Sequence, residues 1–352
     1  MAETVEIFRS ANVLVRHAPQ VGAGTLVISF GPWRSKPALE LEGFGEAFLA
    51  EHGIDAVFVT CASNRWYQYP EMPAALAAIE AVAAPYARRI TYGSSMGAFA
   101  ALAFSRALRA QRVIAISPQY AVGAAQVPFE TRWSREAAAI TWRHRLAEGL
   151  SETAEIVVLY DPLHLDRQHV DLLRRHRPIT AFALPFAGHP AGEMLREVRL
   201  ISRVALGLIH APQRLPDLRR QARQLRGRSA LYWSERARAF AARERFDRAL
   251  EAAERAASLA PGNPRLHHVR GQIALRVGDL AKAVESFTRV ARHSPQQVEP
   301  RLTLARALHR AGDLPAALRE AEAGLALQPE EPRLRDFHDR LVARLAREGR
   351  PA

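Results

Sequence analysis

A serine stands between two glycines in the stretch "TYGSSMGAFAALAF", where a short apolar segment gives way to an Ala-rich one. Gly93 precedes Ser95 by two positions, and Gly97 follows it by two. Side chains at the two glycine positions would obstruct a sharp turn from strand to helix, and such a turn lifts a serine hydroxyl above the end of a sheet. Ser95 therefore has the local setting of a nucleophile.

A nucleophilic serine needs a base to accept its proton and an acid to orient that base. Candidates follow two later apolar segments, because "DPLHLD" comes after "EIVVLY" and "AGHPAGEM" comes after "ITAFALPF". We predict His189 as the base and Asp161 as the acid. Asp166 is the alternative acid, although its position before "RQHVDLLRRH" is also that of a helix N-cap. Solvated or core-edge positions suffice for the other histidines of this region, His164, His169 and His176.

The segment 93–97, between a strand-like and a helix-like pattern, resembles the nucleophile elbow of the α/β-hydrolase family. That family carries its serine, acid and histidine in this chain order. The resemblance implies a Ser–Asp–His triad with backbone N–H donors for the oxyanion. The amide of Met96 is the first expected donor. Gly31 or Trp33 must provide the second, since Pro32 between them has no N–H.

Two loops are expected at the same edge of the sheet. The loop "CASNRWYQYPEM" is rich in aromatic residues, although only 7% of the chain is Phe, Trp or Tyr. We expect it to line the substrate pocket, with packing at the rim as the alternative. The lining residues would be Asn64, Arg65, Trp66 and Tyr67. The second loop, "PQYAVGAAQVPFETRW", is too short for a large lid, and we therefore expect an open site.

Short apolar segments alternate with helical patterns through the first two hundred residues. They are "TLVISF", "DAVFVT", "RITYG", "RVIAIS", "EIVVLY" and "ITAFAL". Such alternation predicts a mostly parallel sheet with helices on both faces. Ligands of these sheets bind beyond the carboxyl ends of the strands, where the candidate residues above all fall. We assign residues 1–211 to this α/β-hydrolase-like domain.

Residues 212–228 are strongly basic, with six arginines against one aspartate. We expect a connector that leads into a solvated linker helix, with Arg219, Arg223 and Arg226 on one face, and contact with an anionic surface is the alternative. No aromatic residue interleaves with these arginines as a stacking platform would require, so nucleic-acid binding is not expected. The formal net charge of +13 does not change this, because nearly every basic residue is Arg and the chain is rich in Ala. This indicates a compositional bias.

The chain from 229 to 330 repeats with a period of 34 residues. Prolines recur at this spacing at Pro261, Pro295 and Pro329, and alanines recur in step with them. The pattern resembles the tetratricopeptide repeat, most closely in "RGQIALRVGDLAKAVESFTRVARHSP". We predict three repeats, followed by a capping helix and tail over 331–352. Three repeats are about the minimum that buries a continuous core.

The first helices of tetratricopeptide repeats line a concave groove. The resemblance places polar, net basic side chains there, namely Arg238, Arg265, His268, Gln272, Arg306 and His309. We expect the groove to bind an acidic peptide or a protein partner. The alternative is that the repeats stabilise the chain or its self-association.

Several classes of protein are not expected. A lone cysteine, Cys61, excludes a disulfide framework. No apolar run approaches the roughly 20 residues of a membrane span, and the N-terminus lacks a signal-peptide pattern. We therefore expect a cytoplasmic protein, and we predict neither a cofactor nor a metal ion.

Together these features predict a serine hydrolase of the esterase, thioesterase or acyltransferase type. Its substrate would be an acyl ester or thioester, including one carried on a larger molecule, and the repeats would recruit a partner or a polymeric substrate. One alternative is a non-catalytic scaffold whose repeats carry the function. Another is an O-acyltransferase that uses the same triad.

Overall fold

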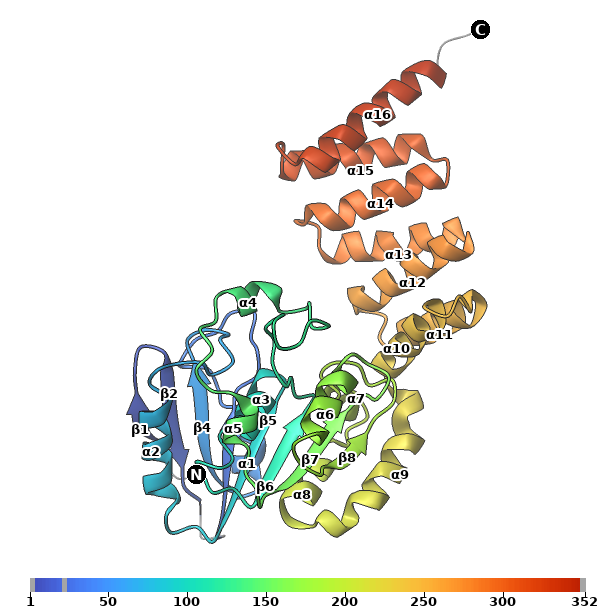
Figure 1. Ribbon diagram of the computed structural model, residues 1–352. Helices are drawn as coiled ribbons and strands as arrows, with labels where there is room; N and C mark the ends of the chain where they lie inside the picture. Colours follow the sequence, from blue (N-terminus) through green and yellow to red (C-terminus); the bar gives the residue numbers. More distant parts are fainter. Residues whose placement is uncertain (1–3, 21–23, 349–352) are drawn as a thin grey trace. The chain divides into compact units, whose positions relative to one another are not determined.

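The computed structural model describes residues 4–20 and 24–348 (Figure 1). The chain divides into two compact units, Met1–Arg226 and Gly227–Ala352. The first unit contains a sheet with helices packed on it, and the described part of the second is entirely helical. Within the described residues, no helix combines the length and the apolar character needed to cross a bilayer.

The sheet has eight strands in the order β1-β2-β4-β3-β5-β6-β7-β8. Strands β1 and β2 form a hairpin that pairs antiparallel with β4, and every other neighbouring pair is parallel. The bounds are β1 (Val5–Arg9), β2 (Val13–Ala18), β3 (Thr25–Phe30), β4 (Asp55–Cys61), β5 (Arg88–Ser94), β6 (Arg112–Ile116), β7 (Glu155–Tyr160) and β8 (Thr180–Ala183). The six predicted strands are present, and the hairpin is an addition.

Both faces of the sheet are covered, because every residue of β3 and β4 is buried. All residues of the Ala-rich helix α3 are buried as well, against β3, β5 and β6. Small side chains allow this close approach. The helices of this unit are α1 (Glu46–Glu51), α2 (Met72–Ala83), α3 (Met96–Ala103), α4 (Ser134–Ala138), α5 (Leu146–Gly149), α6 (Asp166–Arg174), α7 (Gly192–Glu197), α8 (Ile201–His210) and α9 (Leu215–Leu225).

The helix expected within 212–228 is present as α9, but it packs on the first unit and is not a solvated connector. Leu215, Leu218 and Ala222 form a buried apolar stripe, and the helix packs on α8 and β8. Arg219 donates a hydrogen bond to a β8 carbonyl and places its guanidinium 5.6 Å from the centre of the Phe182 ring. The buried stripe joins α9 to the first unit, so the predicted domain boundary at 211 moves to 226.

The second unit consists of three helix pairs and a closing helix. Gly278 and Gly312 adopt φ values of 88° and 85° at the turns inside two pairs, and the aspartate after each glycine caps the next helix. Gly271 must be small, since a Cβ there would lie 2.7 Å from the Phe287 ring. The helices are α10 (Ala230–Ala241), α11 (Phe246–Leu259), α12 (Pro264–Val277), α13 (Leu280–His293), α14 (Val298–Arg310), α15 (Leu314–Leu327) and α16 (Pro332–Glu348). The predicted tail beyond 348 lies outside the described residues.

Candidate active site

Ser95 lies on the sharp turn between β5 and α3, with φ 53° and ψ −118°. This backbone conformation is rare for a residue with a side chain and stores strain. A Cβ on Gly93 would lie 2.2 Å from the carbonyl oxygen of Gly97, and one on Gly97 would lie 2.1 Å from that of Phe30. Both positions therefore exclude any larger residue, as the sequence pattern predicts.

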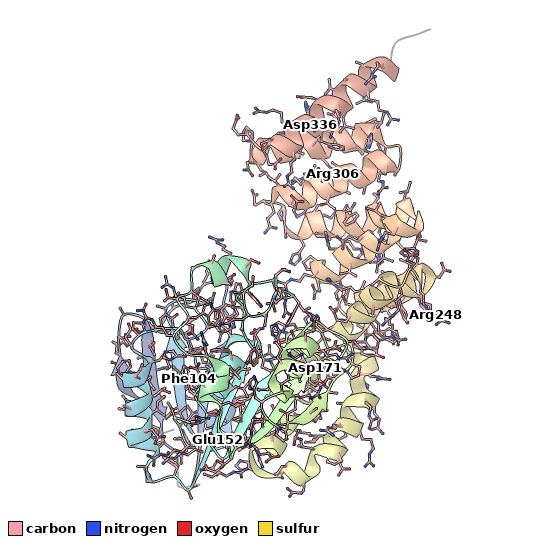
Figure 2. The ribbon with its side chains drawn as sticks, in the orientation of Figure 1. Phe104, Glu152, Asp171, Arg248, Arg306 and Asp336 are labelled. Carbon is pink, nitrogen blue, oxygen red and sulfur yellow. The ribbon has the colours of Figure 1, made fainter. Side chains whose placement is uncertain are left out.

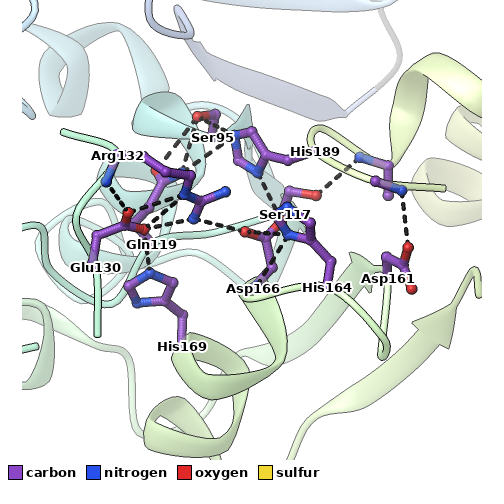
Figure 3. Close-up of polar contacts among 12 residues, drawn as sticks. Ser95, Ser117, Gln119, Glu130, Arg132, Asp161, His164, Asp166, His169 and His189 are labelled. Carbon is purple, nitrogen blue, oxygen red and sulfur yellow. Dashed lines mark hydrogen bonds and ion pairs between the residues drawn. The ribbon is translucent and has the colours of Figure 1, made fainter. Parts of the chain in front are cut away.

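Three side chains form a continuous hydrogen-bonded chain beyond the ends of β5, β7 and β8 (Figure 3). Ser95 Oγ lies 3.0 Å from Nε2 of His189, and Nδ1 of His189 lies 2.7 Å from Oδ2 of Asp166. The carboxylate requires a proton on Nδ1, which leaves the lone pair of Nε2 facing the serine hydroxyl. The arrangement can therefore take a proton from Ser95 and hold the resulting imidazolium.

The expectation that Asp161 pairs with His189 is wrong. Asp161 accepts hydrogen bonds from the amides of Leu163, at 2.8 Å, and Gly188, at 2.9 Å. Its carboxylate is thus used to join the loops that follow β7 and β8. The alternative, Asp166, is the first residue of α6, and Leu165 occupies the N-cap position. The turn at 161–165 brings that residue to the histidine.

Asp166 is fully buried, and two further side chains lie next to its Oδ1. Arg132 Nη2 donates from 3.0 Å, and His164 Nδ1, which accepts the backbone N–H of Asp166, lies 3.1 Å away. Burial by itself raises the pKa of the Asp166 carboxyl, but the contacts with His164 and His189 lower the pKa by more than burial raises it. The resulting pKa lies far below the ordinary value, and the group is ionised at neutral pH.

A second buried carboxylate, Glu130, lies behind Asp166. Its Oε1 accepts from Nε of Arg132 at 3.0 Å, and its Oε2 lies 2.9 Å from Nε2 of His169. Burial raises the pKa of Glu130, but the contacts with His169 and Arg132 outweigh it and lower the pKa to about 2. Arg132 therefore bridges two buried carboxylates. Sequence reasoning missed this network and placed His164 and His169 in solvated or core-edge positions, yet both contact these acids.

Gln119 also belongs to the site, and sequence reasoning missed it. Its Nε2 lies 3.1 Å from Ser95 Oγ and 3.4 Å from Nε2 of His189. Trp66 Nε1 donates to its Oε1 at 3.3 Å. The only sequence signal was its position three residues after β6, which is the strand beside β5.

The residues expected to provide oxyanion donors differ in whether their amides already donate a hydrogen bond. Met96 is the first residue of α3, so its amide has no carbonyl acceptor one turn earlier in the helix. The amide of Gly31 donates to the Val59 carbonyl at 3.1 Å and extends the β3–β4 ladder, which corrects the expectation for this residue. Of the two residues expected to give the second donor, Trp33 remains.

The aromatic loop after β4 contributes mainly to packing. Trp66 and Tyr67 are 0% and 1% exposed, and the Tyr67 hydroxyl donates to the Gly31 carbonyl at 2.8 Å. Asn64 donates to the Arg34 carbonyl at 2.7 Å and so fixes the neighbouring loop. Asn64 and Tyr67 do line a small cavity that Gly31 and Met96 share. Trp66 is buried and Arg65 is exposed, which corrects the expected pocket for these two residues.

The expected open site is closed at the serine. Ser95 is only 5% exposed. The ring centre of Trp133 lies 5.6 Å from that of Trp33, 5.4 Å from that of Trp66 and 6.3 Å from that of His189. Trp33 follows β3, Trp66 belongs to the aromatic loop after β4, and Trp133 lies in the segment between β6 and β7. Large aromatic rings thus surround the candidate nucleophile.

His164, Asp166 and His189 form a group whose ligand atoms lie within 4.8 Å of one another, found among the described residues. Two imidazoles and a carboxylate are suitable ligands for several metal ions. However, the carboxylate already accepts from His189 and Arg132, and His164 Nδ1 accepts the backbone N–H of Asp166. These contacts fit an acid–base network rather than a metal centre.

The repeat unit has its own groove, lined by basic and apolar residues. Arg238 and Gln272 line it as predicted, and Arg276 and Arg310 join them beside Val269. The other predicted groove residues do not line this cavity. Arg265 and Arg306 are exposed, and Arg306 lies on α14 (Figure 2). The rings of His268 and His309 pack 5.7 Å from those of Phe287 and Phe337, respectively.

Known proteins resemble part of the second unit. Residues 274–345 match the family model described as tetratricopeptide repeat, which confirms the predicted repeats at the C-terminal end. Similar solved structures include the first tetratricopeptide-repeat domain of Spaghetti (RPAP3) bound to an HSP90 peptide, with 18% identity and a TM-score of 0.31, covering 34% of this chain and 95% of that one.

Two further solved structures have the same coverage of this chain. MamA MSR-1 is 23% identical, with a TM-score of 0.31 and 68% of its own length covered. The OM64 repeat domain of Arabidopsis is 16% identical, with a TM-score of 0.30 and 98% covered. No curated protein matches the chain.

Proposed function

We propose that the chain is a serine hydrolase of the α/β-hydrolase type that cleaves an acyl ester or thioester. The observation that carries this proposal is the chain of hydrogen bonds from Ser95 through His189 to Asp166. A buried carboxylate, a correctly oriented imidazole and a hydroxyl on a strained turn are the parts that nucleophilic acyl transfer requires.

In the first half-reaction, Ser95 Oγ attacks the acyl carbonyl while its proton moves to Nε2 of His189. The tetrahedral oxygen gains a negative charge that the amide N–H of Met96 is suited to stabilise by donating a hydrogen bond. The intermediate then collapses, and the imidazolium gives its proton to the leaving oxygen or sulfur. Asp166, held ionised, stabilises the imidazolium throughout.

In the second half-reaction, water attacks the acyl-enzyme, with His189 again acting as base. An acceptor hydroxyl in place of water would make the same site an O-acyltransferase. Because Ser95 is only 5% exposed, side chains around it must move for a substrate to enter. We therefore expect the acyl group, and not a large carrier, to enter the site.

The repeat unit supports a second role, the binding of a protein partner. Its groove combines arginines from α10, α12 and α14 with an apolar floor. Arginine guanidinium groups pair with carboxylates in bidentate geometry. We infer that the partner is an acidic peptide segment, which also applies if the first unit is a non-catalytic scaffold.

A fluorophosphonate probe tests the hydrolase proposal, because it reacts covalently with activated serines. The purified chain should be labelled, and Ser95→Ala should abolish labelling. Ser94→Ala is a matched control, since Ser94 is the neighbouring serine and is equally buried, at 5% exposed. Labelling that persists in Ser95→Ala, or a wild-type chain that never reacts, contradicts the proposal and favours the scaffold.

A further inference from the structure

Gln119 contacts both groups that exchange the proton in the proposed reaction. Its side chain is 0% exposed, so it is held by protein contacts alone. The Nε2 atom lies 3.1 Å from Ser95 Oγ and 3.4 Å from Nε2 of His189 (Figure 3). A buried amide needs partners for both its oxygen and its nitrogen, and these contacts supply those of the nitrogen.

Trp66 determines which way the Gln119 amide faces. An indole N–H is only a donor, so the atom 3.3 Å from Trp66 Nε1 must be the amide oxygen. The NH₂ group is then directed at Ser95 and His189. Trp66 is itself fully buried, and the amide cannot turn over without losing this hydrogen bond.

Ser95 Oγ lies 3.4 Å from the amide oxygen and 3.1 Å from the amide nitrogen of Gln119, but it lies nearest to Nε2 of His189, at 3.0 Å. His189 donates from Nδ1 to Asp166, so its Nε2 accepts the proton of Ser95 Oγ. A hydroxyl oxygen has two lone pairs, and one of them accepts an N–H of Gln119. When the hydroxyl proton leaves, negative charge builds on Oγ and strengthens this hydrogen bond.

We propose that Gln119 is a catalytic residue that stabilises the negative charge on Ser95 Oγ as the acyl bond forms, and that Trp66 is its positioning residue. The inference rests on the proposed hydrolase function. Gln119 neither gains nor loses a proton: the hydroxyl proton passes to His189, and the electron pair left on Oγ forms the bond to the acyl carbon. This donor acts on the attacking oxygen, whereas the Met96 amide acts on the carbonyl oxygen.

The test is the pre-steady-state burst of p-nitrophenol from p-nitrophenyl acetate, which reports acylation of the full chain. Gln119→Met keeps the length of the side chain and removes both donors. Gln119→Glu keeps the acceptor for Trp66 and removes the donors, and it serves if the first variant does not fold. Each should lower the acylation rate about 10²–10³-fold, with KM nearly unchanged. Gln126→Met, an exposed site in the same segment, should acylate like the wild type.

Trp66→Phe tests the positioning role, because it keeps an aromatic ring and loses the indole N–H. It should lower kcat by less than Gln119→Met, again with KM unchanged. Wild-type acylation rates in both Gln119 variants, or a rise in KM alone, would overturn the inference while the labelling of Ser95 upholds the hydrolase. A wild-type chain that neither reacts with the probe nor shows a burst overturns both.

Discussion

Arg132 and His189 engage opposite oxygens of one buried carboxylate. Nη2 of Arg132 lies 3.0 Å from Oδ1 of Asp166, and Nδ1 of His189 lies 2.7 Å from Oδ2. Arg132 also forms an ion pair with Glu130. Its ion pair with Asp166 joins the segment between β6 and β7 to the candidate acid. These contacts lower the pKa values of the two buried carboxyls, and the stability of the fold therefore depends on pH.

The first prediction concerns the identity of the acid. Asp166→Asn should lower turnover of an activated ester by about 10⁴-fold, because the amide no longer selects the required tautomer of His189. Asp161→Asn should cause a far smaller loss of turnover and destabilise the fold by about 1–3 kcal/mol, since it weakens two amide contacts. Steady-state kinetics and urea unfolding of both variants check this. The opposite order of activities would return the role to Asp161.

The second prediction concerns acid stability. The pKa of Glu130 falls from 4.5 to about 2 in the folded chain. A carboxyl with a lowered pKa stabilises the fold above its unfolded pKa and loses that contribution as the pH falls toward the folded one. The free energy of unfolding should therefore drop by roughly 3 kcal/mol between pH 4.5 and 2 through this group.

Urea unfolding at stepwise lower pH measures the effect. Glu130→Gln should be less stable than the wild type at neutral pH and should depend less steeply on pH in this window. Glu148→Gln, at an exposed position on α5, should keep the wild-type slope. Equal slopes for the wild type and Glu130→Gln would contradict the prediction.

The third prediction concerns the repeat groove. Reversing Arg238, Arg276 and Arg310 to Glu should weaken the binding of a fluorescent decapeptide of Glu and Asp, and wild-type binding should decline with salt. Turnover of a small ester should not change. Fluorescence anisotropy at two salt concentrations gives the affinities.

A matched triple variant controls for net charge in this experiment. The exposed arginines Arg248, Arg255 and Arg292 lie on the second helices α11 and α13, and they do not line the groove. Reversing these three should affect peptide binding much less. Equal losses in the two triple variants would assign the binding to overall charge.

The fourth prediction concerns the boundary between the units. A chain ending at residue 226 should fold and keep small-ester turnover, whereas one ending at 211 should aggregate or melt at a lower temperature. The shorter chain loses α9 with Leu215, Leu218 and Ala222, which uncovers apolar surface on α8 and β8. Light scattering and circular dichroism melting distinguish the two. A stable, monomeric chain ending at 211 would show that α9 is dispensable.

Local sequence was sufficient for the elbow and the histidine. A Cβ at Gly93 would meet Gly97, and one at Gly97 would meet Phe30 on the neighbouring strand β3. The spacing of the two glycines around Ser95 was therefore enough to predict the turn. His189 follows the last predicted strand closely enough that its place at the sheet edge was fixed. The repeats were predictable for a similar reason, because the period indicates which small residues lie where two helices pack together.

The acid and its network were not predictable in the same way. Asp161 and Asp166 are separated by one tight turn, and which of them reaches His189 depends on the hydrogen bonds of that turn. Gln119 and Arg132 lie in an irregular segment without hydrophobic periodicity, so no local pattern indicates where their side chains point. Their partners are distant in the sequence and become neighbours only in the folded sheet.

The order of the strands has a consequence for how the chain folds during its synthesis. The strands β5, β6, β7 and β8 are neighbours in the sheet in the order in which they occur in the chain. Ser95, Gln119, Asp166 and His189 follow these four strands in the same order. A nascent chain leaving the ribosome can therefore extend the sheet one strand at a time, without opening pairs already formed. Ser95 is synthesised first and His189 last. We therefore expect the nascent polypeptide to be inactive until β8 has paired with β7.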